Sequence, residues 1–281
     1  MQRLQKRPAR AARALKTRVL VLLILALLLM AVSLLAPYLA PNDPNATNSA
    51  AIHAAPSAQY PFGTDKLGRC VFSRVLMGAR TSIFSAVALV ALSFAAGSAL
   101  GVLCGYYGGV LDALVMRLAD LMLAFPQMVL AIAVAGVLGG GLLGAMLALG
   151  ITSWTLYARL ARSHTMALKA EPFIAAAKLS GCGDARILLR HILPNIVGPL
   201  VVNAATQLGT TMIGLAGLSF LGLGVVPPNA EWGSMISEAR SYIQLAPWAV
   251  LAPAGATVLT VMIFNDLGDA VRDLADGSGV T

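Results

Sequence analysis

Ser219 and the three histidines are the residues whose types suit nucleophilic catalysis. A catalytic serine needs a neighbouring base, which a histidine can supply. Ser219 lies in Gly-Leu-Ser-Phe-Leu-Gly, which lacks the G-x-S-x-G spacing of a nucleophile elbow. His53, His164 and His191 all fall outside the long apolar runs, whereas Ser219 lies inside one. None of the three is therefore placed to activate Ser219. The sequence therefore predicts no catalytic residue, and an intramembrane serine enzyme using Ser219 stays the enzyme alternative.

Metal and disulfide chemistry has as little support. Cys70, Cys104 and Cys182 fall in three separate regions, form no C-x-x-C and leave no even pairing. No apolar run holds a cluster of histidines and cysteines that would bind a bare metal ion such as nickel. We predict no metal site and no disulfide.

The composition identifies the class of protein. Hydrophobic residues make up 58% of the 281, charged residues 11%, and the mean hydropathy is +0.79. A soluble domain has about 25% charged residues, so the chain is predicted to be an all-α polytopic membrane protein in contact with the lipid bilayer. The net charge of +8 comes without a basic patch interleaved with aromatic residues, so no nucleic-acid partner is expected.

Six apolar runs are long enough to cross a membrane, which takes about 20 residues each. Two of them form a nearly continuous pattern, which Gly139-Gly140-Gly141 interrupts, and a tight hairpin at these glycines is predicted to give two transmembrane helices. The predicted runs are 19–39, 82–105, 118–138, 141–160, 196–223 and 248–267.

Lys and Arg residues in the connections predict the orientation. With a cytoplasmic N-terminus, 15 of the 20 lie on the inner side and 5 on the outer side. A basic start before an apolar run also suits a secretory signal peptide, but this run exceeds the roughly 7–15 apolar residues of such a peptide. We therefore predict a cytoplasmic basic N-terminus at 1–18, a first transmembrane helix at 19–39 and an extracytoplasmic segment at 40–81. A transmembrane domain follows at 82–267, with a cytoplasmic loop at 163–195 and an extracytoplasmic loop at 224–247. The chain is predicted to end in a cytoplasmic tail at 268–281.

The charged stretch 169–195 carries its own helix signals. Pro172 suits the first helical position, and Glu171 before it faces the positive end of the helix dipole. Alanines at 175–177 favour a helix, and Gly181 is expected to stop it. The sequence predicts a helix of about ten residues, a turn, and a second amphipathic segment that ends at a proline. Because short helices are marginal in water, this one should pack against a partner.

The spacing within this stretch resembles a known family. It reads A-A-A-x-x-x-G from Ala175 to Gly181 and, after nine more residues, His-Ile-Leu-Pro at 191–194. This is similar to the E-A-A-x-x-x-G-x9-I-x-L-P loop of permease subunits of bacterial ABC importers, in the branch for dipeptides, oligopeptides and nickel. Ala175 stands where the motif has Glu, so docking through a carboxylate at that position is not expected. Further stretches resemble the family in matching order at 62–74, 117–126, 217–233 and 264–273.

The resemblance implies a machine of several subunits in the bacterial inner membrane, and the distribution of Lys and Arg predicts that both termini are cytoplasmic. A second homologous permease, identical or different, would complete the pore, and an extracytoplasmic substrate-binding protein would deliver substrate. This sequence has no G-x-x-x-x-G-K-[ST], so ATP and Mg would be bound by two cytoplasmic ATPase subunits and no cofactor by this chain. The coupling helix that docks on the ATPase would involve Glu171, Pro172, Ala175, Ala176, Ala177, Lys178, Gly181, Asp184 and Arg186. A passive channel, which would need no ATPase, is the transport alternative.

A transport path needs polar groups at membrane depth, where they are costly and therefore informative. Asn203, Gln207 and Thr211 recur every four residues and share one helical face, with Thr210 beside them. They predict either a translocation path or hydrogen bonds that hold helices together.

Gly97, Gly101, Gly105 and Gly109 form another four-residue repeat. Such a repeat is typical of a helix-packing seam, either within this chain or against a second permease.

The substrate stays open between peptides and nickel chelates. Ala175 and the stretch 230–240 resemble the nickel transporters slightly more.

Overall fold

Every regular element among residues 9–278 is helical, and these are the residues that the computed structural model describes, with side chains for 13–275. Residues 1–8 of the predicted basic segment and 279–281 of the predicted tail lie outside this description. The elements are α1 (Ala9–Leu39), η1 (Ser49–Ala51), α2 (Val71–Tyr107), α3 (Gly109–Leu123), α4 (Gln127–Val137), α5 (Gly141–Lys169), α6 (Pro172–Leu179), α7 (Asp184–Ile187), η2 (Leu188–Ile192), α8 (Leu193–Phe220), α9 (Trp232–Ala239), η3 (Arg240–Tyr242) and α10 (Trp248–Ser278).

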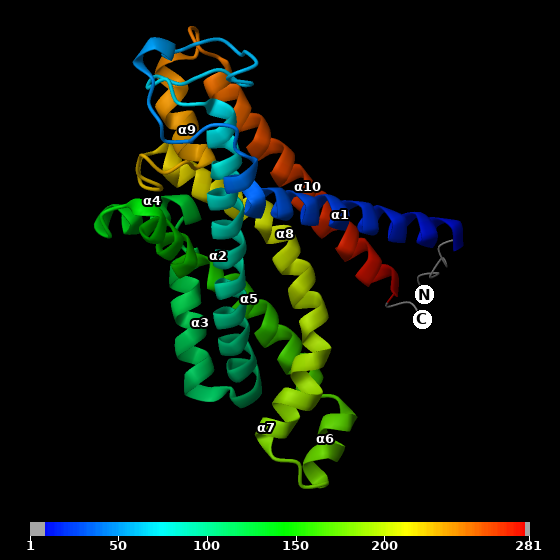
Figure 1. The fold of residues 1–281 in the computed structure, drawn as a ribbon. Coiled ribbons are helices and arrows are strands. Elements are labelled where there is room, and N and C mark those ends of the chain that lie inside the picture. The colour runs from blue at the N-terminus through cyan, green and yellow to red at the C-terminus, as the bar shows by residue number, and fades with distance from the viewer. Residues whose placement is uncertain (1–8, 279–281) are drawn as a thin grey trace.

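The helices α2 and α8 run between two distinct ends of the molecule (Figure 1). One end is formed by α6 and α7, and the other by α9 with the segment 40–70; we refer to them as the α6 end and the α9 end. Among the described residues, five helices are long and apolar enough to cross a membrane, and the bent pair α3–α4 makes up to six. The predicted all-α membrane fold is confirmed.

The predicted run 118–138 is two helices rather than one. α3 begins at Gly109, and the α3–α4 pair is bent by 95° at the short break between Leu123 and Gln127. Pro126 causes the break, because it lacks a backbone N–H and restricts the residue before it to extended conformations. The predicted hairpin at the three glycines is present, since Gly139, Gly140 and Gly141 all have positive φ between the end of α4 and the start of α5.

Two predicted boundaries move outward. α2 begins at Val71, inside the segment predicted as extracytoplasmic, and its 37 residues span about 55 Å, well beyond the roughly 30 Å of bilayer hydrocarbon. α10 continues to Ser278, past the predicted end at 267. α2 is therefore longer than the bilayer hydrocarbon is thick and can carry contacts at both ends of the molecule.

The predicted boundary at Pro194 is absent, since 184–220 is one continuous helical stretch. A π-helical turn, η2, precedes the proline, and the N–H of Leu193 donates to Leu188 O. The wider turn accommodates a residue that has no N–H to give to the α-helical ladder. Asn195 Nδ2 donates to His191 O over 2.5 Å and satisfies another carbonyl there.

Three of the four repeating glycines let α2 and α5 touch backbone to backbone. A Cβ added to Gly97, Gly101 or Gly105 would come within 3.0 Å of a carbonyl oxygen of α5, namely that of Trp154, Ala158 or Arg162. The seam therefore lies within this chain. Gly109 is not part of it, because it starts α3 with φ +63 and its Cβ would meet no described atom within 4 Å.

Replacement of Gly101 by Ala should destabilise the protein. The added methyl group would collide with Ala158 O, and overpacking of this kind costs about 1–3 kcal/mol. Gly198→Ala in α8 is the matched control, because a Cβ there meets no described atom within 4 Å. Thermal unfolding in detergent should show a lower Tm for Gly101→Ala alone. Equal Tm values would contradict the seam.

Candidate functional site

The predicted coupling helix is α6, and it begins and ends close to the predicted signals. Pro172 is its first residue, Leu179 its last, and Gly181 follows in a left-handed conformation with φ +79. Ile174 is 1% exposed, and Ala177 packs beside it against the apolar cluster at this end of the molecule. The helix therefore has one inner face that attaches it to the bundle.

The last turn of α2 holds this loop through Tyr106. The phenol donates to Asp184 Oδ1 over 2.5 Å, and Lys169 Nζ donates to Tyr106 O over 2.5 Å. Lys178 Nζ lies 5.1 Å from the centre of the same ring, a distance suited to a cation–π contact. Two of the predicted coupling residues, Lys178 and Asp184, thus contact α2 rather than only solvent.

The loop carries apolar side chains that the described residues leave exposed. Leu179 is 90% exposed, Leu189 68% and Phe173 44%. Apolar side chains left exposed in a loop that also carries many charges are candidates for contact with another subunit. The other exposed predicted residues on this loop are Glu171, Pro172, Ala175, Ala176, Lys178, Gly181, Asp184 and Arg186.

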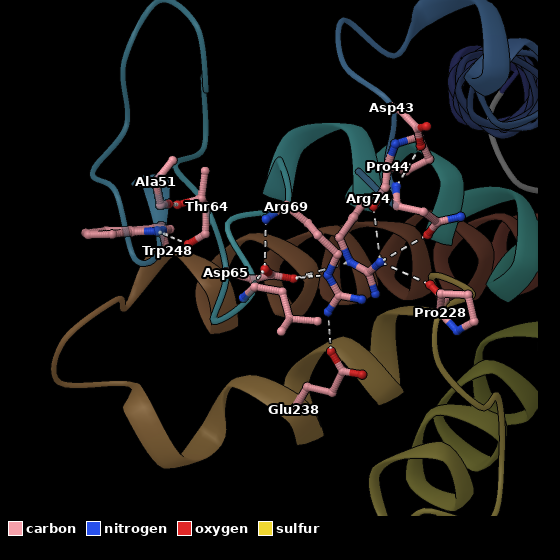
Figure 2. Close-up of polar contacts among 12 residues, drawn as sticks. Asp43, Pro44, Ala51, Thr64, Asp65, Arg69, Arg74, Pro228, Glu238 and Trp248 are labelled. Carbon is pink, nitrogen blue, oxygen red and sulfur yellow. Dashed lines mark hydrogen bonds and ion pairs between the residues drawn. The ribbon is translucent and has the colours of Figure 1, made fainter. Parts of the chain in front are cut away.

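The α9 end is held by a buried network of four charged side chains, the α9-end ion network (Figure 2). Arg69 Nε donates to Asp65 Oδ2 over 2.6 Å, and Arg69 Nη2 donates to Glu238 Oε2 over 2.7 Å. Arg74 Nε lies 3.7 Å from Asp65 Oδ2. Arg69 and Arg74 are each 2% exposed. Two cations meet two anions, so the buried charges balance as burial requires.

Arg74 also ties two distant loops to α2. Its Nη1 donates to Pro44 O over 3.2 Å and to Pro228 O over 3.1 Å. Thr64 attaches the segment before α2 to α10, because its backbone O accepts from Trp248 Nε1 over 3.1 Å. Its hydroxyl donates to Ala51 O within the same segment (Figure 2). The segment before α2 is therefore bound to both α10 and the loop before α9.

A second anchor joins α9 to α2. Glu231 caps α9 by accepting from the N–H groups of Gly233 and Ser234, and it also accepts from Ser82 Oγ over 3.1 Å. Trp232 Nε1 donates to Val75 O over 2.9 Å. Tyr242 lies beside the α9-end ion network. Burial raises the pKa of its phenol to about 12, against a smaller lowering by the Lys66 N–H, so the phenol adds no charge to the network.

Sequence reasoning missed this assembly. The segment 40–81 and the loop 224–247, predicted as separate extracytoplasmic parts, are bound to each other. The signal was present in the sequence, because two arginines and an aspartate within 65–74, beside apolar runs, need partners if they are buried. The partner Glu238 lies too far along the chain to be assigned without the fold.

Three of the four predicted path residues line one small cavity. Gln207, Thr210 and Thr211 border a cavity of about 180 Å³ among α4, α5 and α8, and Asn203 does not. The cavity is also lined by Gln127 and Ser153, which sequence reasoning did not select. Gln127 reaches this cavity because α4 begins directly after the break at Pro126.

The alternatives raised by Ser219 and by metals gain nothing from the structure. Ser219 is buried, and its Oγ accepts from the N–H of Val225 over 3.4 Å where the chain turns after α8. Within the part of the chain that the structure describes, no group of three His, Cys, Asp or Glu side chains could hold a metal ion.

Neutralising Asp65 should destabilise the α9 end. Asp65→Asn would leave Arg69 and Arg74 buried with one anion, and breaking a buried pair in this way costs about 3–5 kcal/mol. Asp43→Asn is the control, because Asp43 is exposed and an amide oxygen can still accept from Asn45 N. Thermal unfolding in detergent should show a large fall in Tm for Asp65→Asn only. An unchanged Tm would contradict the role of the network.

Comparisons with known proteins agree on one family. The model of the family described as "Binding-protein-dependent transport system inner membrane component" matches residues 97–276. The dipeptide transport system permease protein DppC of Alkalihalophilus pseudofirmus is 42% identical over 245 residues, covering 87% of this chain and 81% of the relative. The glutathione transport system permease protein GsiD of Escherichia coli is 45% identical over 246 residues, with the same coverage. DppC of Haemophilus influenzae is 40% identical over 251 residues, covering 87% and 85%.

A solved structure shares the fold. A chain of the inward-facing MetNI methionine ABC transporter superposes with a TM-score of 0.57 at 20% identity, covering 72% of this chain and 97% of that one. The predicted resemblance is thus confirmed: this chain belongs to the family of inner membrane components of binding-protein-dependent transport systems, the permeases of ABC importers.

Proposed function

We propose that this chain forms half of the translocation path of an ATP-driven importer of short peptides. The observation that carries the coupling part is the set of exposed apolar side chains on the loop around α6, which suit a groove on an ATPase subunit. A second permease, two ATPase subunits that bind ATP and Mg, and a substrate-binding protein at the α9 end complete the machine.

Short peptides are favoured over nickel chelates. The relatives described above are named for dipeptides and for glutathione, a tripeptide. A nickel chelate brings its own ligands, so the side chains of this chain do not decide between the two substrates. The peptide assignment rests on the relatives.

Two rigid connections would carry movement from α6 into the membrane. One runs from Asp184 to Tyr106 and so into α2. The other is the continuous helix 184–220, which begins in the loop and ends near the α9 end. Closure of the ATPase pair would push α6, and these connections would turn the push into alternating access.

The loop of α6 is proposed to be cytoplasmic and the α9 end extracytoplasmic, as the distribution of Lys and Arg indicates. Cysteines at Ser180 and Ser241 test this, because both positions are exposed and lie at opposite ends. With Cys182 replaced by Ser, a membrane-impermeant maleimide on intact cells should label Ser241→Cys, and on inside-out vesicles Ser180→Cys. The reverse pattern would overturn the orientation.

A charge on the docking face should uncouple transport. Leu179 is 90% exposed, so Leu179→Asp should leave Tm unchanged yet reduce ATP-dependent peptide uptake in reconstituted complexes at least tenfold, equivalent to about 1.4 kcal/mol. Leu179→Met preserves the apolar surface and should transport normally. Normal uptake by Leu179→Asp would contradict docking through this face.

A further inference from the structure

We infer that the cavity among α4, α5 and α8 is a binding site for the peptide backbone of the substrate, with Gln127 and Ser153 as new contact residues beside Gln207, Thr210 and Thr211. The inference rests on the proposed function and names a substrate site within it. The residues come from three separate helices and meet around about 180 Å³ of space.

The polar groups at this cavity have capacity left for a ligand. Ser153 Oγ donates to Leu149 O over 2.7 Å and accepts from Gln127 Nε2 over 3.3 Å. Within residues 13–275, the side chains of Gln207, Thr210 and Thr211 make no hydrogen bond to the protein. Gln207 and Thr211 are half-buried and Thr210 is exposed, so their donors and acceptors are open to a ligand that enters the cavity.

The break between α3 and α4 positions Gln127 at this cavity. The 95° bend places Gln127 at the first position of α4, and Met128 also lines the cavity. The first turn of a helix leaves N–H groups without intrahelical acceptors, and here the first ladder bond runs from Leu130 N to Pro126 O. Carbonyl or carboxylate oxygens of a ligand can therefore find donors from both the side chain and the start of α4.

The lining suits a peptide backbone rather than a charged group or a metal. Amides and hydroxyls both donate and accept, as does a peptide unit with its N–H and C=O. The cavity is lined by no Asp, Glu, Lys, Arg, His or Cys. Hydrogen bonds to the backbone do not depend on the side chains of the substrate, which suits a path for peptides of varied sequence.

A neighbouring face of α5 offers an internal control. There an apolar cavity of about 480 Å³ between α2, α3 and α5 is lined by Leu147, Gly150 and Trp154, among others. A residue on that face belongs to the same helix as Ser153 but borders the other cavity.

Proximity to substrate is tested with the complete complex and a thiol-reactive tripeptide, in a chain with Cys182 replaced by Ser. During ATP-driven turnover, Ser153→Cys should form an adduct, detected by mass spectrometry and competed by unreactive tripeptide, whereas Leu147→Cys should not. Uptake of the unreactive tripeptide by the unmodified complex is measured in parallel. Uptake without preferential labelling at Ser153→Cys would overturn the inference alone, and absence of uptake would overturn the peptide assignment together with it.

Loss of the amides should weaken substrate binding. Gln127→Leu and Gln207→Leu should each raise the KM for tripeptide uptake about fivefold, as expected for one lost hydrogen bond, while kcat changes little. Leu147→Met, which borders the other cavity, should leave KM unchanged. An unchanged KM in both glutamine variants would count against the site.

Discussion

The backbone contact between α2 and α5 is the constraint on which the remaining structure depends. Gly97, Gly101 and Gly105 leave no room for a side chain, so the two helices lie against each other along several turns. α2 is long enough to extend past a bilayer, and its two ends carry the two functional regions. Its first turns hold the α9-end ion network, and its last turn holds the loop of α6 through Tyr106. A fixed relation between α2 and α5 therefore fixes the relation between the two ends.

The two ends use opposite chemistry. At the α9 end, Asp65, Arg69, Arg74 and Glu238 are largely buried and satisfied by one another, which makes that end one rigid unit even though buried ion pairs add little net stability. At the α6 end, Leu179 remains exposed, and no described residue covers it. The first arrangement suits a part that keeps its shape, and the second suits a part that binds another subunit.

Local signals predicted the loop well, because Pro172 and Gly181 act on the backbone next to them. The glycine repeat predicted the seam as far as α2 continues, and it failed at Gly109 because a four-residue spacing has no meaning past the end of a helix. The ion network could not be predicted, since Arg69 and Glu238 are far apart in the sequence and meet only in the folded chain.

The break at Pro126 was missed for a different reason. The residues around it are apolar on both sides, so hydropathy alone joins them into one run, and the effect of the proline on direction is visible only in three dimensions. The candidate substrate cavity could be predicted only in part for the same reason. Gln207 and Thr211 share a helix and a visible pattern, whereas Gln127 and Ser153 reach the same cavity from other helices.

The most direct test of the account is peptide flux through the complete complex in sealed liposomes. The permease pair, the ATPase subunits and the binding protein are reconstituted together, and accumulation of a labelled short peptide is followed with and without ATP. The account predicts accumulation against a gradient only when ATP and the binding protein are both present. Flux down a gradient in the absence of ATP would show a passive channel and would contradict it.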